Sequence, residues 1–150
     1  PLLCVLVMGT NDLAKELKAA RVPGRAPLLT ALQLSLLAAR DAACIAIDGV
    51  YNDIKDETGF AEECEQGRDF GFDGKTLIHP SQIAPCNHVF APSADAVAEA
   101  LEIIAAFDAP EARGKGVITV GGKMVELLHA EESRRLVAVA DAIAAKEAVK

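Results

Sequence analysis

Three short apolar runs, each followed by polar residues and a helix-like segment, constrain the fold of this chain most. The runs are Leu2–Met8, Cys44–Val50 and Lys75–Ile78, and segments with apolar residues at helical spacing separate them. A short continuous apolar run is typical of a parallel strand that is buried on both faces. Strands that alternate with helices favour βαβ units, so the sequence predicts an α/β fold with a parallel sheet.

The helical patterns complete this alternation and extend beyond it. Pro80 fits the first turn of a helix, where its missing N–H costs nothing, and Ser93 is a good N-cap for a later helix. Three strands are too few to close an eight-stranded barrel and could also form an open sheet, and periodicity does not separate these outcomes. The expected elements are helices over Leu13–Ala20, Leu28–Ala43, Gly59–Phe70, Ser93–Phe107 and Glu131–Lys146, and a hairpin over Gly116–Val125.

Composition narrows the class of protein. The chain has 150 residues, of which 51% are apolar, which is enough for a domain with a core. Its net charge is −7 and its basic residues are scattered, which argues against nucleic-acid binding. No segment reaches the roughly 20 apolar residues that a membrane span needs.

Four widely spaced cysteines without a CxxC pair suit a reducing compartment. We therefore predict a cytoplasmic protein (in the mitochondrial matrix if eukaryotic), and its start without Met or signal peptide suggests a cut from a longer chain.

Polar side chains follow the first two strands. Asp12 follows the first strand in the sequence MGTND, where a carboxylate is well placed to bind Mg²⁺, a cation that prefers oxygen ligands. Alternatively, Asn11 or Asp12 caps the next helix. Asp48 ends the second strand and is the best placed member of an acidic loop that either faces a cavity or is simply solvated. If the loop faces a cavity, we expect Asp48 to bind substrate. Both pairs of interpretations remain open from the residues alone.

The histidines give a weaker signal. His79 precedes Pro80, which favours an extended backbone at the third strand's end. From there it either donates a hydrogen bond to a ligand or anchors the strand-to-helix turn. His88 and His129 lack the spacing of zinc ligands, and the chain has no GxGxxG motif, P-loop or GxSxG nucleophile elbow.

Four blocks of sequence resemble a known family when they are taken in order. The blocks are LVMGTNDLAKEL, AIDGVYNDIKDETGF, GFDGKTLIHPSQI and GKGVITVGGKMVELLHAEESRRLVAVADAI. They resemble the citrate lyase β-chain-like and malyl-CoA lyase group of the HpcH/HpaI aldolase superfamily. The resemblance implies the C-terminal portion of a (β/α)₈ TIM barrel with a helical lid. Residues 1–108 would form about the last three βα units of the barrel, and residues 109–150 the lid.

The resemblance also implies a function and its residues. It implies a Mg²⁺-dependent carbon–carbon lyase that cleaves or forms 3-hydroxyacyl-CoA thioesters of the citryl, citramalyl or malyl type, assembled as a homotrimer or homohexamer. Asp12 would bind Mg²⁺, Asn11 would line the substrate site, and Ile78 and His79 would contact coenzyme A. Glu126 matches a catalytic lid aspartate and would keep the carboxylate with one more methylene, although it could instead be a surface residue that starts a helix.

The same resemblance predicts that the isolated chain is inactive. The family's second metal ligand, a glutamate, and the basic residues that hold the substrate carboxylate and coenzyme phosphates come from earlier barrel units. Two alternatives remain. One is an aldolase that acts on a free 2-oxo acid, and the other is a non-catalytic half-barrel that serves as an assembly module.

Overall fold

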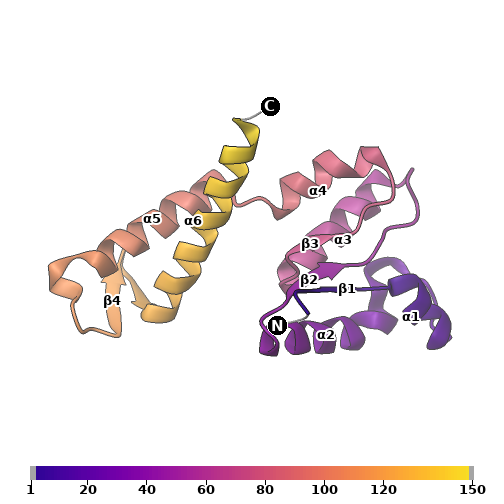
Figure 1. Cartoon of the computed structure of the whole chain (residues 1–150), viewed down its shortest axis with the longest axis horizontal. Helices are drawn as coiled ribbons and strands as arrows, with labels where there is room; N and C mark the ends of the chain where they lie inside the picture. Colours follow the sequence, from indigo (N-terminus) through magenta and orange to yellow (C-terminus); the bar gives the residue numbers. More distant parts are fainter. Residues whose placement is uncertain (1–2, 149–150) are drawn as a thin grey trace. The chain divides into compact units, whose positions relative to one another are not determined.

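The computed structural model describes residues 3–148, which pack as two compact units (Figure 1). The first unit comprises residues 1–90 and the second residues 91–150. This packing boundary lies before the predicted division at 108/109, because helix α5 (Ala94–Asp108) packs against helix α6 (Leu127–Glu147) within the second unit. The assignment of residues 1–108 to barrel units stays a prediction.

The first unit contains a parallel three-stranded sheet, as the apolar runs predicted. Strands β1 (Val5–Val7), β2 (Ile45–Asp48) and β3 (Gly74–Lys75) are hydrogen-bonded in the order β1-β2-β3. β3 is shorter than predicted and ends at Lys75, because the residues after it turn towards the next helix. The predicted first strand also included Leu2, which lies outside the described residues.

In the described part of the first unit, four α-helices and two 3₁₀ segments accompany this sheet. Their bounds are α1 (Thr10–Glu16), η1 (Pro23–Leu28), α2 (Leu29–Asp41), α3 (Glu57–Phe70), η2 (Pro80–Gln82) and α4 (Ile83–Phe90). Pro80 opens η2, as predicted, and η2 continues directly into α4. The capping interpretation of Asn11 and Asp12 is wrong, because α1 already begins at Thr10 with Gly9 as its N-cap. Both side chains are therefore available for other interactions.

The core of the first unit lies between the sheet and its helices. Leu32, Leu36 and Ala39 lie on one side of α2 and pack with Cys44 and Ala46 of the β2 segment. A second cluster joins α3 to α4 through Phe60, Cys64 and Cys86. The other face of the sheet remains open within this unit, where the Val7 side chain is 57% and the Ile45 side chain 50% exposed.

The second unit is a helical pair with a hairpin. Ser93 caps α5 by accepting a hydrogen bond from the Ala96 N–H at 3.1 Å, as predicted. After η3 (Pro110–Ala112), strands β4 (Val117–Val120) and β5 (Lys123–Glu126) pair antiparallel. Gly121 and Gly122 both have positive φ, which the two-residue hairpin turn requires. α6 begins at Leu127, four residues before the predicted start, since the chain passes directly from β5 into the helix.

Within the described residues, none of the helices combines the length and apolar character needed to cross a membrane.

Substitution of Leu32 should test the packing of α2 on the sheet. The Leu32 side chain is fully buried, so Leu32→Ala should lower the free energy of unfolding by about 2–5 kcal/mol. Leu37 lies on the same helix but is 67% exposed, so Leu37→Ala should change it by no more than about 0.5 kcal/mol. Urea unfolding followed by circular dichroism would measure both, and equal effects would contradict the described orientation of α2.

Candidate functional site

The polar rim of the site forms where β1 and β2 end. The carboxyl ends of parallel strands meet at one edge of a sheet, and here Asn11 and Asn52 follow the two strands. Asn11 Nδ2 donates to Asn52 Oδ1 at 3.0 Å, and Asn52 Nδ2 donates to Asn11 Oδ1 at 2.8 Å. This reciprocal amide pair ties the two rim segments together and orients Asn11.

A cavity of about 690 Å³ opens beside this amide pair. Its volume lies within the roughly 300–1,000 Å³ that is usual for small-molecule sites. The walls come from the start of α1, the segment that contains η1, the residues after β2, and one side of α3. Its polar and charged lining residues are Thr10, Asn11, Arg21, Arg25, Tyr51, Asn52, Asp53, Asp56, Thr58, Glu62, Glu63 and Gln66.

A buried cluster of four charged side chains lies next to the cavity. Asp48 is fully buried and does not line the cavity itself. Arg25 Nη1 donates to both Asp48 carboxylate oxygens, at 2.7 and 2.9 Å, and Lys75 Nζ donates to Asp48 Oδ2 at 3.0 Å. Lys75 Nζ also bonds Glu63 Oε1 at 2.7 Å. Two cations and two anions therefore balance, which meets the requirement that buried charges be paired.

Arg25 connects this cluster to the cavity wall. Its backbone has φ of 55°, an uncommon conformation for a residue other than glycine. The guanidinium Nε donates to Gln66 Oε1 at 2.9 Å, and Gln66 in turn donates from Nε2 to the Gly24 carbonyl at 2.8 Å. These bonds fasten η1 to α3, and the irregular segment 20–28 is thereby fixed as one wall of the cavity.

Tyr51 and Asp56 form a second polar contact at the cavity. Tyr51 Oη donates to Asp56 Oδ2 at 2.6 Å, while Asp56 Oδ1 accepts from the Gly59 N–H at 2.9 Å and caps α3. The hydrogen bond to the Asp56 carboxylate, together with burial, raises the pKa of Tyr51 to about 12. The same bond lowers the pKa of Asp56.

Gln82 joins the segment after β2 to the segment after β3. Its side chain is buried, and its Oε1 accepts from the Ile78 N–H at 3.0 Å while its Nε2 donates to the Tyr51 carbonyl at 3.1 Å. Ile78 and His79 are exposed, and His79 Nδ1 lies 2.8 Å from Ser81 Oγ. The buried Gln82 side chain therefore fixes the segment after β3, which carries both predicted coenzyme contacts.

The structure places the predicted site residues of the first unit in different surroundings. Asn11 lines the cavity, whereas Asp48 is engaged in the buried cluster. Asp12 is exposed on the first turn of α1 and does not line the cavity. Residues 3–148 contain no group of three or more His, Cys, Asp and Glu side chains that could hold a metal ion. Asp12 fits Mg²⁺ only as one ligand among several, because such sites use one or two carboxylates with water and substrate oxygens.

Glu126 lies in the second unit, at the start of α6. Its side chain accepts from the backbone of His129, and its own N–H donates to His129 Nδ1 at 2.9 Å, which forms a capping box. The structure thus shows the helix-start role that the sequence left open for Glu126. Its predicted catalytic role stays a prediction.

Several site residues were missed at the level of sequence. Arg25 lies in a Pro- and Gly-containing connection without periodicity, and Gln82 sits in a helix entrance where it has no obvious role. Lys75 carried a signal that could have been used, because a lysine inside a buried strand requires a carboxylate partner. Asp48 at the end of the neighbouring strand was the nearest candidate.

Comparison with known proteins identifies the class to which this fold and site belong. The sequence profile of the HpcH/HpaI aldolase/citrate lyase family matches residues 2–80, more than half of the chain, so the chain belongs to that family. It is 54% identical over 145 residues to a (3S)-malyl-CoA thioesterase of Cereibacter sphaeroides, covering 97% of this chain and 51% of the relative. It is 37% identical over 121 residues to citrate lyase subunit beta of Escherichia coli, covering 81% and 40%.

Solved structures agree with this family. A structure of CitE from Mycobacterium tuberculosis in complex with magnesium, acetoacetate and coenzyme A has a TM-score of 0.69 and 31% identity, covering 88% of this chain and 51% of that one. A citrate lyase from Burkholderia xenovorans has a TM-score of 0.77 at 23% identity, covering 96% and 47%, and supports the fold alone. The resemblance inferred from the four sequence blocks is confirmed, and the chain spans about half the length of the curated relatives it matches.

Loss of the Asp48 charge should destabilise the first unit. Asp48→Asn leaves Arg25 and Lys75 buried with only Glu63 as a carboxylate partner, so the free energy of unfolding should fall by about 3 kcal/mol or more. Asp69 forms an exposed pair with Arg68, and Asp69→Asn should cost less than about 1 kcal/mol. Urea titrations of the two variants would measure the difference, and a small effect of Asp48→Asn would contradict the described cluster.

Ionisation of Tyr51 should be directly observable, because it is the single tyrosine of a chain without tryptophan. Tyrosinate absorbance should rise with a midpoint near pH 12, against an ordinary pKa of 10. Since the pKa is raised on folding, the stabilisation from the protonated hydroxyl is complete below pH 10 and is lost between pH 10 and 12.

Asp56→Asn provides the matched test of that cause. It removes the carboxylate acceptor, so the midpoint should move back towards 10, whereas Asp95→Asn, at the start of α5, should leave it unchanged. An unchanged midpoint in Asp56→Asn would show that another group holds the proton on Tyr51.

Proposed function

We propose that this chain is the C-terminal half of a Mg²⁺-dependent enzyme that acts on a 3-hydroxyacyl-CoA thioester of the malyl-CoA type. The observation that carries the proposal is the 54% identity to a (3S)-malyl-CoA thioesterase, which extends over 97% of the chain. The cavity and polar rim at the carboxyl edge of the sheet support it, because α/β enzymes bind their ligands at this edge.

Hydrolysis of the thioester is the first candidate reaction. In hydrolysis, water attacks the thioester carbonyl and the carbon–sulfur bond breaks, which releases a hydroxy acid and free coenzyme A. Cleavage of a carbon–carbon bond is the second candidate, favoured by the likeness to citrate lyase subunit beta and to CitE. In that reaction the 3-hydroxyl loses its proton, the bond between carbons 2 and 3 breaks, and an acetyl-CoA enolate takes up a proton.

The roles of individual residues follow from their positions. Asn11, held by Asn52, can donate an amide hydrogen bond to a carboxylate or carbonyl oxygen of the substrate. Ile78 and His79 are exposed and could contact the coenzyme, and Gln82 fixes the segment that carries them. Asp48 orients Arg25 and Lys75 beneath the site, so we assign it a supporting role and no direct substrate contact.

Two further roles depend on parts beyond the first unit. Asp12 would be one of the oxygen ligands of Mg²⁺, with the remaining ligands supplied by substrate, water and the other half of the enzyme. When bound, Mg²⁺ supplies Lewis-acid polarisation of a substrate oxygen. Glu126, on the lid segment 109–150, would transfer the proton as a general acid/base in carbon–carbon cleavage.

The open face of the sheet supports the half-barrel interpretation. Val7 and Ile45 are half-exposed apolar strand residues, and such residues are packed in layers inside a TIM barrel. We propose that residues 1–108 complete a (β/α)₈ barrel with the other half of the enzyme, which then assembles as a trimer or hexamer. The isolated chain should therefore show no turnover.

A chimera tests the proposed function. This chain would replace the matching half of the Cereibacter sphaeroides (3S)-malyl-CoA thioesterase, and the chimera would be assayed with malyl-CoA and Mg²⁺. Free coenzyme A, detected with a thiol reagent and without glyoxylate, indicates hydrolysis, whereas glyoxylate with acetyl-CoA indicates carbon–carbon cleavage. We expect Mg²⁺-dependent hydrolysis by the chimera and none by the isolated chain.

The metal role has its own matched pair of variants. In the chimera, Asp12→Asn should reduce turnover at least about 100-fold at limiting Mg²⁺, since it removes a ligand charge. Asp41→Asn, at the exposed end of α2, should leave turnover unchanged. Turnover by the isolated 150-residue chain, or full activity of Asp12→Asn, would overturn the proposal.

A further inference from the structure

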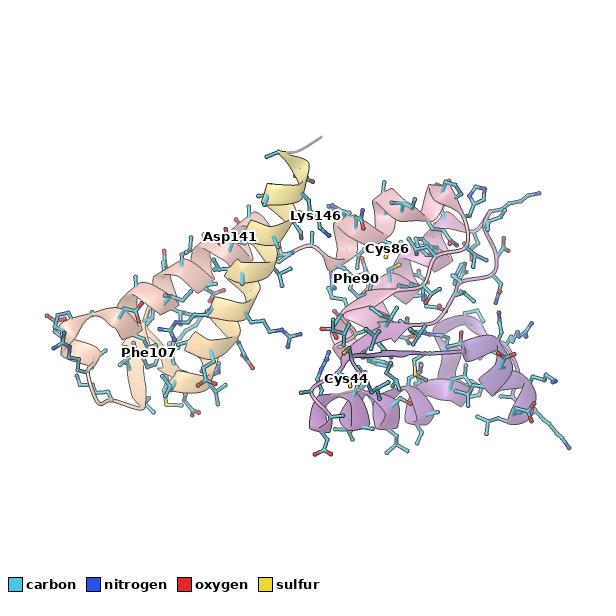
Figure 2. All side chains as sticks on the ribbon, in the orientation of Figure 1. Cys44, Cys86, Phe90, Phe107, Asp141 and Lys146 are labelled. Carbon is cyan, nitrogen blue, oxygen red and sulfur yellow. The ribbon has the colours of Figure 1, made fainter. Side chains whose placement is uncertain are left out.

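Two of the four cysteines lie together in the interior of the first unit. Cys64 of α3 is 0% exposed and Cys86 of α4 is 5% exposed, and both belong to the core cluster that joins the two helices. Figure 2 labels Cys86 on α4, within the first unit. The two side chains pack with Phe60 in this one buried cluster, and the interaction between the thiols is the first cause of the pKa shift of each. Neither thiol takes part in the candidate site described above.

The surroundings of the two thiols are unequal. The interaction between the thiols lowers the pKa of Cys86 and raises that of Cys64. Burial opposes the lowering at Cys86, while the Lys75 ammonium and a backbone hydrogen bond from Lys75 promote it. The thiolate is the reactive form of cysteine, so Cys86 is the more reactive member of the pair.

The other two cysteines lie outside this cluster, next to the start of the β1–β2 strand pair, where the Ile45 N–H donates to the Cys4 carbonyl at 3.0 Å. Cys44 Sγ contacts the Leu3 and Ala42 carbonyl oxygens at 3.4 and 3.6 Å, and Cys4 is exposed. Among the described residues, Cys64 and Cys86 are the cysteines that are buried together in one core cluster.

We propose that Cys64 and Cys86 are an oxidisable dithiol, which a peroxide converts to a disulfide between α3 and α4. The Cys86 thiolate attacks one peroxide oxygen, the O–O bond breaks, and the other oxygen leaves as hydroxide, which gives a sulfenic acid on Cys86. The sulfur of the Cys64 thiol then attacks Cys86 Sγ, and the thiol proton passes to the departing sulfenic oxygen, which leaves as water. Two thiols and one hydrogen peroxide thus yield one disulfide and two waters.

The bond would form beside the candidate site. Glu63, which bonds Lys75, precedes Cys64, and Gln82, which holds Ile78, lies one turn before Cys86. A disulfide would therefore join the helix that carries part of the cavity wall to the helix that follows the coenzyme-side segment. This inference concerns the thiols alone and does not depend on the proposed function.

Peptide mapping of the native chain tests the proposal without any substitution. The folded chain would be treated with one equivalent of hydrogen peroxide at neutral pH, alkylated and digested with trypsin. We expect peptides 56–68 and 76–113 to be joined by a disulfide, with a mass two hydrogens below the sum of the two free peptides. Dithiothreitol should separate them. The same treatment in urea should distribute disulfides among the four cysteines.

Matched variants separate the roles of the two thiols. Cys44→Ser should leave the cross-link unchanged. In Cys64→Ser, dimedone should trap a sulfenic acid on Cys86, and labelling of Cys64 in Cys86→Ser should be at least tenfold lower. The proposal is overturned if both thiols remain reduced in the folded wild-type chain while Cys4 is oxidised. A 64–86 cross-link no more abundant in the folded chain than in urea would also overturn it.

Discussion

The buried carboxylate of Asp48 is the constraint on which the first unit depends. A fully buried charge without partners would be costly, and here Arg25, Lys75 and Glu63 balance it in one cluster. The partners come from η1, β3 and α3, three segments that are far from one another in the chain. Satisfying this one carboxylate therefore fixes the position of the cavity wall, the strand order beside it, and one side of α3. The left-handed backbone of Arg25 is held by the same contacts.

The charge cluster around Asp48 also positions the rim of the site. With β2 and β3 held in register at Asp48 and Lys75, the segments after the strands emerge at one edge. The Asn11–Asn52 amide pair joins the first two of these segments, and Gln82 joins the second to the third. The charge of Lys75 also favours the thiolate forms of Cys64 and Cys86 and so influences their pKa, which links the charge cluster to the two thiols. Polar side chains that line the cavity and those that hold the fold are thus direct neighbours.

Much of the fold could be predicted from local pattern. The apolar runs, the helical spacing, Ser93 as a cap and the glycine pair of the hairpin are read from neighbouring residues, and the structure agrees with them. The errors lie at ends and boundaries. α1 begins early enough to place Asn11 and Asp12 inside it, and β3 stops at Lys75. Each depends on packing against distant segments, which spacing along the chain does not encode.

The sequence by itself determined the class of protein and the strand ends where polar groups gather. Its motif blocks led to the HpcH/HpaI aldolase/citrate lyase family, and the profile match confirms that membership. Only the tertiary structure decided which of these polar groups face the cavity and which lie beneath it. Asp48 looked like a rim carboxylate, but its partners stand 23 and 27 residues away, and folding buries all of them together. A carboxylate becomes a ligand or a structural anchor according to the cations that the fold brings to it, and that pairing is a property of three-dimensional contact.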